Sequence, residues 1–243
     1  MKIKNRQFGL ALIMATAVSA CSPETPKNVI ESATTDSSAV MELTAQVDAL
    51  EKEVGLVRDV NEIKRLQRIY GYYLDRSDWD NVLDLLTDDA TGEYGNGGVY
   101  VGKNSIKELF YGIGYGESGL QEGQIREHIQ LQPVITVAPD GMSAKGRWRV
   151  LAILGQHDEY ARWQAGPYED EYRKEDGVWK ITKLHWLETF TVPFKGAWTT
   201  KMEQINVADR KIPEADEPPT IEYEPWPGVS LLPYHYVNPV TGK

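Results

Sequence analysis

The chain has 243 residues, of which 41% are hydrophobic and 26% are charged, and its formal net charge is −10. This length suits one domain with a sizeable core plus terminal extensions. The acidic balance argues against binding to nucleic acid, which needs clustered Lys and Arg, and the single cysteine, Cys21, excludes an internal disulfide.

Residues 1–20 are predicted to be an export signal. A basic start, MKIKNRQ, precedes the apolar run FGLALIMATAV, which is too short for a permanent membrane-spanning helix. VSAC then fits the bacterial lipoprotein box, which predicts lipidation of Cys21; plain secretion is the alternative. Ser22 favours the outer membrane, so we expect a periplasmic protein held in outer-membrane lipid by acylated Cys21. Removal of three basic signal residues changes the net charge from −10 to −13.

Residues 21–38 are rich in Ser, Thr and Pro and are predicted to form a flexible tether. A helical segment is expected over residues 39–57, where apolar residues recur at alternating steps of three and four. The members of this seam are Val40, Leu43, Val47, Leu50, Val54 and Val57. A coiled-coil seam of fewer than three heptads is only marginally stable by itself. The segment is therefore either an oligomerisation stalk or a helix packed on its own domain.

The globular domain is expected over residues 58–200, beginning with a helix from about residue 59 to 74. Ile63, Leu66, Tyr70 and Tyr73 share one helical stripe. A short helix capped by Ser77 or Asp78 follows, then two short strands around the GNGG turn. KNSIKELFYGI predicts another short helix, capped by Asn104 or Ser105.

Strands are predicted from about residue 126 onward. REHIQLQPVITV alternates, with His128, Gln130 and Gln132 on one face and Ile129 and Leu131 on the other. SAKGRWRVLAIL and the segment from YARWQ to LETF supply three more long strands of a meander. The element order predicts an α+β fold in which helices pack on one face of a strongly curved antiparallel sheet. Such a sheet leaves a conical pocket open at one end.

Residues 201–243 are predicted to be a C-terminal arm. The segment has many prolines and too many large aromatic residues for a disordered tail. We expect an extended arm packed on a protein surface, of its own or a neighbouring subunit. Tyr234 and His235 lie in this arm, where they are candidates for closing a site.

Several segments resemble the SnoaL-like domains of the nuclear transport factor superfamily of cone-shaped α+β folds. LQRIYGYYLDRSDWDNVLDLLTDDA resembles their opening, and TFTVPFKGAW resembles their closing motif. DRSDWD and YRKEDGVWKI are also similar to parts of the scytalone dehydratases. The resemblance spans roughly residues 57 to 200. The superfamily hosts dehydratases, isomerases, cyclases and non-catalytic binding domains.

The resemblance implies an acid–base dyad of Asp75 and His128 inside the cone, with Tyr70 and Tyr168 facing the substrate. Leu74 stands where the dehydratases have a catalytic tyrosine. The chemistry is sound in itself, because an aspartate that accepts the Nδ1–H of a histidine fixes its tautomer and frees Nε2 for proton transfer. The alternatives are a solvated or capping carboxylate for the aspartate and a solvent-facing strand for the histidine.

Further pocket candidates are residues whose side chains combine bulk with a polar group: Tyr73, Tyr94, Trp148, Arg149, Asp170 and His185. Tyrosines supply neutral donors for a developing oxyanion, and an arginine suits a phenolate or carboxylate. Core packing and exposure on the outer face are the alternatives. No cofactor is needed for this chemistry, and no His, Cys, Asp or Glu cluster has metal-site spacing.

The sequence and the resemblance together predict a cofactor-independent lyase acting on a small hydroxylated aromatic compound, with lignin-derived compounds as one candidate source. Dehydration and retro-aldol-like loss of formaldehyde are the two reactions considered. A non-catalytic aromatic-binding lipoprotein and an isomerase or cyclase are the alternatives. The seam and the arm argue against a monomer. The Val and Leu arrangement favours two strands, whereas the resemblance implies three subunits, and the trimer is favoured over the dimer.

Overall fold

The computed structural model describes residues 27–114, 116–199, 212–229 and 232–243. The predicted signal and Cys21, the predicted lipidation site, lie outside these residues. The chain divides into two compact units, Met1–Leu50 and Glu51–Lys243. In the described residues, no helix is both long enough and apolar enough to cross a membrane.

One helix, α1 (Lys27–Asp75), covers residues 27–38 of the predicted tether and both helices predicted after it, whereas residues 21–26 of the tether lie outside the described residues. Its sequence contains no proline, and its glycines each cost only about 1 kcal/mol in a helix interior, so the polar Ser/Thr-rich stretch continues the helix. The predicted seam is exposed in both units, with fractional exposures of 52% to 63% from Val40 to Val57. The seam therefore has no covering surface within the chain as described.

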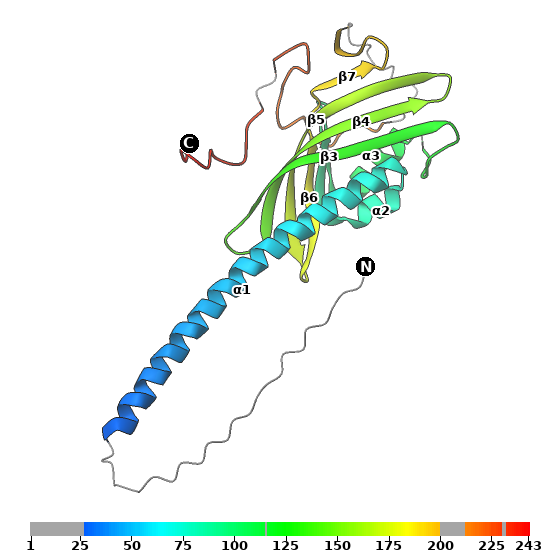
Figure 1. Cartoon of the computed structure of the whole chain (residues 1–243). Helices are drawn as coiled ribbons and strands as arrows, with labels where there is room; N and C mark the ends of the chain where they lie inside the picture. The colour runs from blue at the N-terminus through cyan, green and yellow to red at the C-terminus, as the bar shows by residue number, and fades with distance from the viewer. Residues whose placement is uncertain (1–26, 115, 200–211, 230–231) are drawn as a thin grey trace, which may run out of the picture. The chain divides into compact units, whose positions relative to one another are not determined.

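The second unit contains a curved mixed sheet (Figure 1). Its strands are β1 (Leu86–Tyr94), β2 (Val99–Val101), β3 (Gln124–Val137), β4 (Ser143–Gln156), β5 (Tyr160–Glu175), β6 (Val178–Trp186) and β7 (Phe190–Pro193). The order is β2-β1-β6-β5-β4-β3, and β7 pairs with β5. The predicted pair around GNGG and the long meander are antiparallel as expected, whereas β1 and β6 run parallel.

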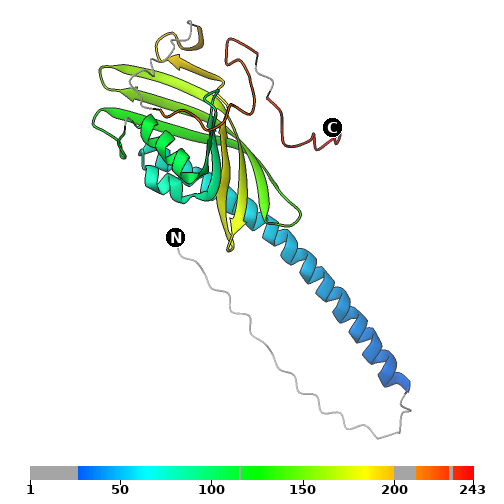
Figure 2. The ribbon, with the colours of Figure 1, turned by 180° about the vertical axis from the view of Figure 1, so that it is seen from behind.

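Helices α2 (Trp79–Asp84) and α3 (Gly102–Ile113) lie on the concave side of the sheet (Figure 2). Asp78 is the N-cap of α2 as predicted, although its carboxylate accepts from the Asn81 side chain at 2.7 Å. The predicted caps of α3 are wrong. The helix begins at Gly102, and Ser105 instead donates a hydrogen bond to Asp216 at 2.5 Å.

The core lies between these helices and the inner face of the sheet. On α1, Ile63, Leu66 and Tyr70 are buried as the helical stripe predicts, and the next buried hydrophobic side chain is Leu74 rather than the half-buried Tyr73. From the strands of the sheet, the core receives the side chains that face inward, which are every second residue of an alternating strand. A short 3₁₀ turn (Ala197–Thr199) follows β7.

On the side away from β4, strand β5 has two pairing partners, and Gly166 separates them. Its Tyr168–Glu175 half pairs with β6, and its Arg162–Ala165 part pairs with β7. The chain crosses between β6 and β7 so closely that a Cβ on Gly166 would lie 2.1 Å from the Leu187 carbonyl oxygen. Only glycine permits this crossing, which carries Glu188 into the cavity described below.

In edge strand β3 the alternation of exposure is interrupted after Leu131 and resumes, shifted by one residue, from Pro133 to Val137. The pairing register with β4 shifts between Leu131 and Val134, and Gln132 has φ of +50° and is exposed. A proline cannot donate to the sheet, so Pro133 is accommodated by a bulge at an edge. The prediction that Gln132 shares the face of His128 is therefore wrong.

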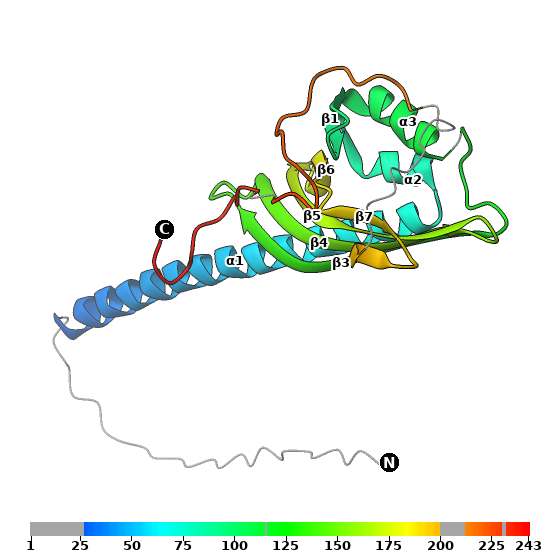
Figure 3. The ribbon, with the colours of Figure 1, turned by 90° about the horizontal axis from the view of Figure 1, so that it is seen from above.

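The described parts of the C-terminal arm pack on their own domain. Glu217 pairs with Val99 of β2, and Thr220 donates two hydrogen bonds to the Glu93 carboxylate. Figure 3 shows this segment passing around β1. Farther along, His235 contacts Glu169 at 2.9 Å on the outer face of the sheet, so it does not close the cavity.

Candidate active site

A cavity of about 280 Å³ lies between the inner face of the sheet and the helices. Its walls are largely aromatic: Trp79, Tyr94, Tyr100, Phe110, Tyr168 and Trp186. Its polar lining comes from Arg126, His128, Arg162, Gln164 and Glu188. Ile212 of the arm also lines it. A small apolar cavity with a few convergent polar groups is the usual form of a ligand site.

Asp75 and His128 meet through two hydrogen bonds. Asp75 is the last residue of α1, and its Oδ1 accepts from the His128 backbone N–H at 2.7 Å and from the imidazole Nδ1–H at 3.0 Å. The two side chains are only 15% and 14% exposed. His128 lines the cavity and Asp75 lies behind it. Because Nδ1 is bound to the carboxylate, Nε2 is the ring nitrogen left for proton transfer.

A glycine lets the helix approach this strand. A Cβ on Gly71 would lie 3.3 Å from the His128 carbonyl oxygen and 3.0 Å from Cγ of Gln130. Both distances are shorter than ordinary van der Waals contact. The absence of a side chain at residue 71 therefore helps α1 carry Asp75 within hydrogen-bonding distance of β3.

Three tyrosine hydroxyls from different elements form a second cluster. The Tyr70 hydroxyl hydrogen-bonds the hydroxyl of Tyr94 and that of Tyr168, the latter at 3.2 Å. Tyr94 and Tyr168 line the cavity, and Tyr70 supports them from behind. Burial raises the pKa of all three phenols. They are therefore neutral hydrogen-bond donors near neutral pH.

A buried polar network lies behind the tyrosines. Asp170 accepts from the Gln67 side chain at 2.9 Å, and Gln67 accepts from Tyr172 at 2.8 Å. The Tyr172 hydroxyl accepts from Trp148 Nε1 at 2.8 Å. Desolvation raises the pKa of Asp170, partly opposed by the hydrogen bond from the His185 backbone N–H. Trp148 and Asp170 thus lie outside the cavity lining, where they support its wall.

The remaining predicted pocket residues lie elsewhere. His185 is buried, with Nε2 3.3 Å from Glu93 Oε2, and desolvation lowers its pKa. Tyr73 is half-buried and packs on the core without lining the cavity. Arg149 is exposed on the outer face, because it alternates with the buried Trp148 and Val150. A strand alternates in this way whichever face is buried. The sequence pattern alone therefore did not decide whether Arg149 faces the cavity or the outer face of the sheet.

Four polar lining residues were not predicted: Arg126, Arg162, Gln164 and Glu188. Arg126 lies two residues before His128, so strand alternation was sufficient to place it on the same face. Arg162 and Gln164 share one face of β5, but β5 pairs with β6 along one half and with β7 along the other, and no local pattern shows which end lines the cavity. Burial raises the pKa of Glu188, opposed by a hydrogen bond from Thr191 and by the Arg162 charge.

Comparison with known proteins gives a family and a fold. The model of the SnoaL-like domain family matches residues 56–185. A candidate scytalone dehydratase from Novosphingobium aromaticivorans is 23% identical, with a TM-score of 0.51 over 58% of this chain and 90% of that one. The hexachlorocyclohexane dehydrochlorinase LinA-type3 from Novosphingobium barchaimii is 19% identical, with a TM-score of 0.52 over 59% and 95% of the chains. At these identities the two structures establish the shared cone-shaped fold.

Proposed function

Because this chain belongs to the SnoaL-like domain family, whose model matches more than half of it, we propose that it is an acid–base lyase acting on a small hydroxylated aromatic compound without a cofactor. One observation supports this most directly. A histidine oriented by a buried carboxylate faces an aromatic-walled cavity that also contains neutral phenolic donors.

In the proposed reaction, His128 Nε2 removes a proton from the substrate. Asp75 holds the imidazole in the required tautomer and stabilises the imidazolium that forms. In a dehydration, the proton comes from carbon and the electron pair of the C–H bond becomes a C=C bond as water leaves. In a retro-aldol cleavage, the proton comes from the hydroxyl of a hydroxymethyl group, and the electron pair of that O–H bond becomes the C=O bond of formaldehyde. The electron pair of the broken C–C bond stays on the remaining carbon, which takes up a proton. The imidazolium can return the proton in either case.

The tyrosine pair provides electrostatic stabilisation. Tyr94 and Tyr168 are neutral and lie at the cavity wall. The Tyr70 hydroxyl has one hydrogen for its two hydrogen bonds, so at least one of these tyrosines donates to Tyr70, and the other can donate to an oxygen on which negative charge develops. Trp186 Nε1 is a further buried donor in the wall, and it makes no hydrogen bond to the described residues. These donors favour a substrate with more than one oxygen substituent.

The size of the cavity limits the substrate. About 280 Å³ is just below the range of roughly 300–1,000 Å³ that is common for drug-sized ligands. We therefore favour a compound with one aromatic ring.

The test is turnover of a panel of aromatic alcohols, with and without hydroxymethyl groups, followed by mass spectrometry for loss of water or formaldehyde. His128→Ala should abolish turnover while leaving folding intact. His157→Ala, at an exposed histidine of the β4–β5 turn, is the matched control and should behave like the native chain. Full activity of His128→Ala would refute the proposal. Binding with every ligand recovered intact would favour a non-catalytic binding protein instead.

We also propose export and anchoring through lipidated Cys21, with self-association through the exposed seam. The lipoprotein box supports the first and the uncovered heptads support the second. Cys21→Ser should move the protein from the membrane fraction to the soluble fraction of cells. An unchanged membrane fraction would count against lipidation.

A further inference from the structure

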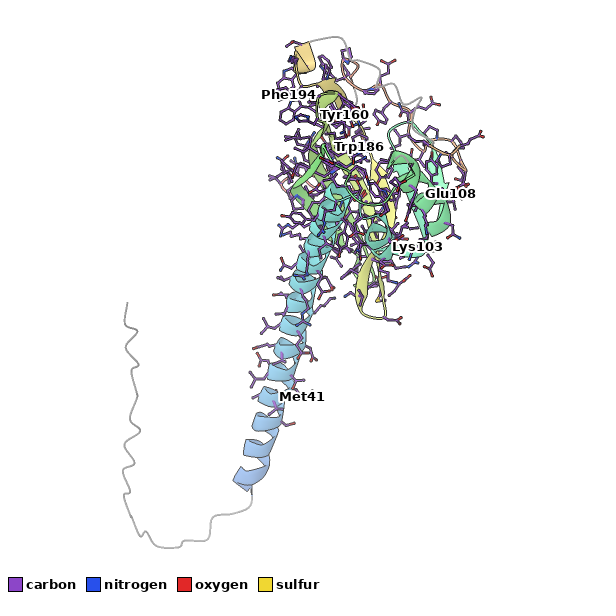
Figure 4. All side chains as sticks on the ribbon, turned by 90° about the vertical axis from the view of Figure 1, so that its right-hand side faces the viewer. Met41, Lys103, Glu108, Tyr160, Trp186 and Phe194 are labelled. Carbon is purple, nitrogen blue, oxygen red and sulfur yellow. The ribbon has the colours of Figure 1, made fainter. Side chains whose placement is uncertain are left out.

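Glu188 enters the cavity from the crossing between β6 and β7, and its backbone is fixed on both sides. The backbone N–H groups of its two neighbours, Leu187 and Thr189, donate to carbonyl oxygens of β5 at 2.9 and 2.7 Å. The Thr189 carbonyl oxygen accepts from the backbone N–H of Trp226 in the C-terminal arm at 2.7 Å. Figure 4 shows Trp186, which ends β6 two residues before Glu188, within the body of the domain. A side chain on a backbone fixed in this way is held in a defined position.

Polar side chains from β5, β7 and the arm surround the Glu188 carboxyl group. The Gln164 amide donates to the Thr191 hydroxyl oxygen at 2.9 Å, and the Thr191 hydroxyl donates to Glu188. The charge of Arg162 acts on the same carboxyl group from β5. From the arm, the Tyr223 phenol lies near Glu188, and burial and the Glu188 charge both raise the pKa of this phenol. The carboxyl group therefore has one positive charge and three groups that are neutral near pH 7 around it.

Glu188 and His128 lie on opposite walls of the cavity. One row across the inner face of the sheet joins four strands through His128 of β3, Ala152 of β4, Gln164 of β5 and Thr191 of β7. Three strand spacings place the first and last backbones of this row about 14 Å apart along the sheet. Because the sheet curves around the cavity, the His128 imidazole and the carboxyl group bound by Thr191 both extend into it, with the small side chain of Ala152 between them. A substrate in this space meets both groups, one on each side.

The Glu188 carboxyl group is suited to giving a proton. Burial raises its pKa, and the hydrogen bond from Thr191 and the charge of Arg162 oppose this rise without cancelling it. A carboxyl group with a raised pKa keeps its proton to a higher pH than an exposed glutamate does. Arg162 then stabilises the carboxylate that remains after the proton has been given. An acid and a base in different environments on two walls of one cavity are the usual arrangement for acid–base catalysis.

We propose that Glu188 is the general acid of the reaction and protonates the substrate on the side opposite to His128. This inference rests on the proposed function, since it assigns the second proton transfer of that reaction. In a dehydration, His128 Nε2 takes the proton from carbon, the electron pair of the C–O bond leaves with the hydroxyl oxygen, and Glu188 protonates that oxygen so that water departs. In a retro-aldol cleavage, Glu188 protonates the carbon that keeps the electron pair of the C–C bond. In both reactions a proton then returns from the imidazolium to the carboxylate through water that enters as the product leaves.

The test compares two leaving groups on the same one-ring skeleton. The first probe, 3-hydroxy-1-(4-hydroxyphenyl)propan-1-one, has an acidic C–H beside its carbonyl group and a hydroxyl that must be protonated to leave as water. The same probe can lose formaldehyde by retro-aldol cleavage. In the second probe, 3-chloro-1-(4-hydroxyphenyl)propan-1-one, the leaving group is chloride, which needs no proton. Turnover of both is measured with the full chain, and the uncatalysed rate is subtracted.

Glu188→Gln keeps the shape of the side chain and removes its acidic proton. We expect kcat/KM for the hydroxy ketone to fall about 100-fold or more, as is usual for loss of a general acid, and that for the chloro ketone to change by less than about threefold. Glu188→Asp keeps an acid and should retain part of the activity on the hydroxy ketone. Glu159→Gln, at an exposed residue of the β4–β5 turn, is the matched control and should behave like the native chain with both probes.

A second measurement needs no turnover. ¹³C NMR titration of the glutamate carboxyl groups should show one that titrates above the ordinary value of 4.5 in the native chain and is missing from Glu188→Gln. Equal losses for the two probes in Glu188→Gln, or a Glu188 carboxyl group that titrates at or below 4.5, would overturn the inference. Full chloride elimination by His128→Ala would refute the lyase proposal instead. That result changes neither the titration nor the difference between the two leaving groups, so the two failures are distinguishable.

Discussion

Replacing Asp75 with Asn tests the dyad with the smallest change of shape. The carboxylate Oδ1 accepts two hydrogen bonds from His128, at 2.7 and 3.0 Å. An amide oxygen can keep these contacts but not the charge. Hydrogen bonds to charged groups contribute about 1.5–3 kcal/mol and neutral ones about 0.5–1.5, so the midpoints of these ranges differ by about 1.25 kcal/mol, a loss of roughly tenfold for each bond. If the amide instead presents its NH₂ to Nδ1, Nε2 carries the proton and the base is lost. The serine-protease triad then sets an upper bound of about 10⁴ in kcat.

Two measurements check this reasoning. The first is kcat/KM for Asp75→Asn, His128→Ala and the double variant, on whichever panel alcohol the native chain converts. Since Asp75 acts through His128, the double variant should be no slower than His128→Ala. The second is the ¹⁵N NMR spectrum of the His128 ring, which reports its tautomer without any substrate. Native kcat/KM in Asp75→Asn, or effects of the two changes that multiply, would refute the positioning role.

Three further outcomes are expected. Gly71→Ala adds a Cβ 3.3 Å from the His128 carbonyl oxygen and should lower kcat several-fold. Thermal stability should not fall, because alanine is more favourable than glycine in a helix by about 1 kcal/mol. An unchanged kcat would show that the close approach of α1 to β3 is unimportant. Burial raises the pKa of Asp170 above 3.8, so its contribution to stability is complete below that pH and is lost as pH rises through the raised pKa. Urea unfolding at about pH 4 and 8 should therefore show that the free energy of unfolding of the native chain falls relative to that of Asp170→Asn as the pH rises. A difference between the two proteins that is the same at both pH values would contradict the raised pKa. Leu43→Glu with Leu50→Glu places charges on the exposed seam and should convert an oligomer to a monomer in light scattering; an unchanged mass would exclude the seam as the interface.

Local patterns in the sequence were sufficient for the architecture. The helical stripe of Ile63, Leu66 and Tyr70 is buried as predicted, and the element order gives the expected α+β fold. These features depend on periodicity, which each segment carries by itself. The exceptions are local too: α1 runs unbroken because polar composition does not end a helix that lacks proline, and Gln132 leaves its predicted face because Pro133 requires a bulge.

The site was only partly accessible from the sequence. Asp75 and His128 came from motifs, and the structure brings them within hydrogen-bonding distance. Arginine was expected in the pocket, but at residue 149 rather than at 126 and 162.

The physical reason lies in what alternation encodes. It separates the two faces of a strand without saying which face the sheet curves around. Glu188 reaches the cavity only because the chain crosses beside Gly166 between two strands. Sequence periodicity thus determined which elements form, whereas sheet register and curvature decided which side chains share the cavity.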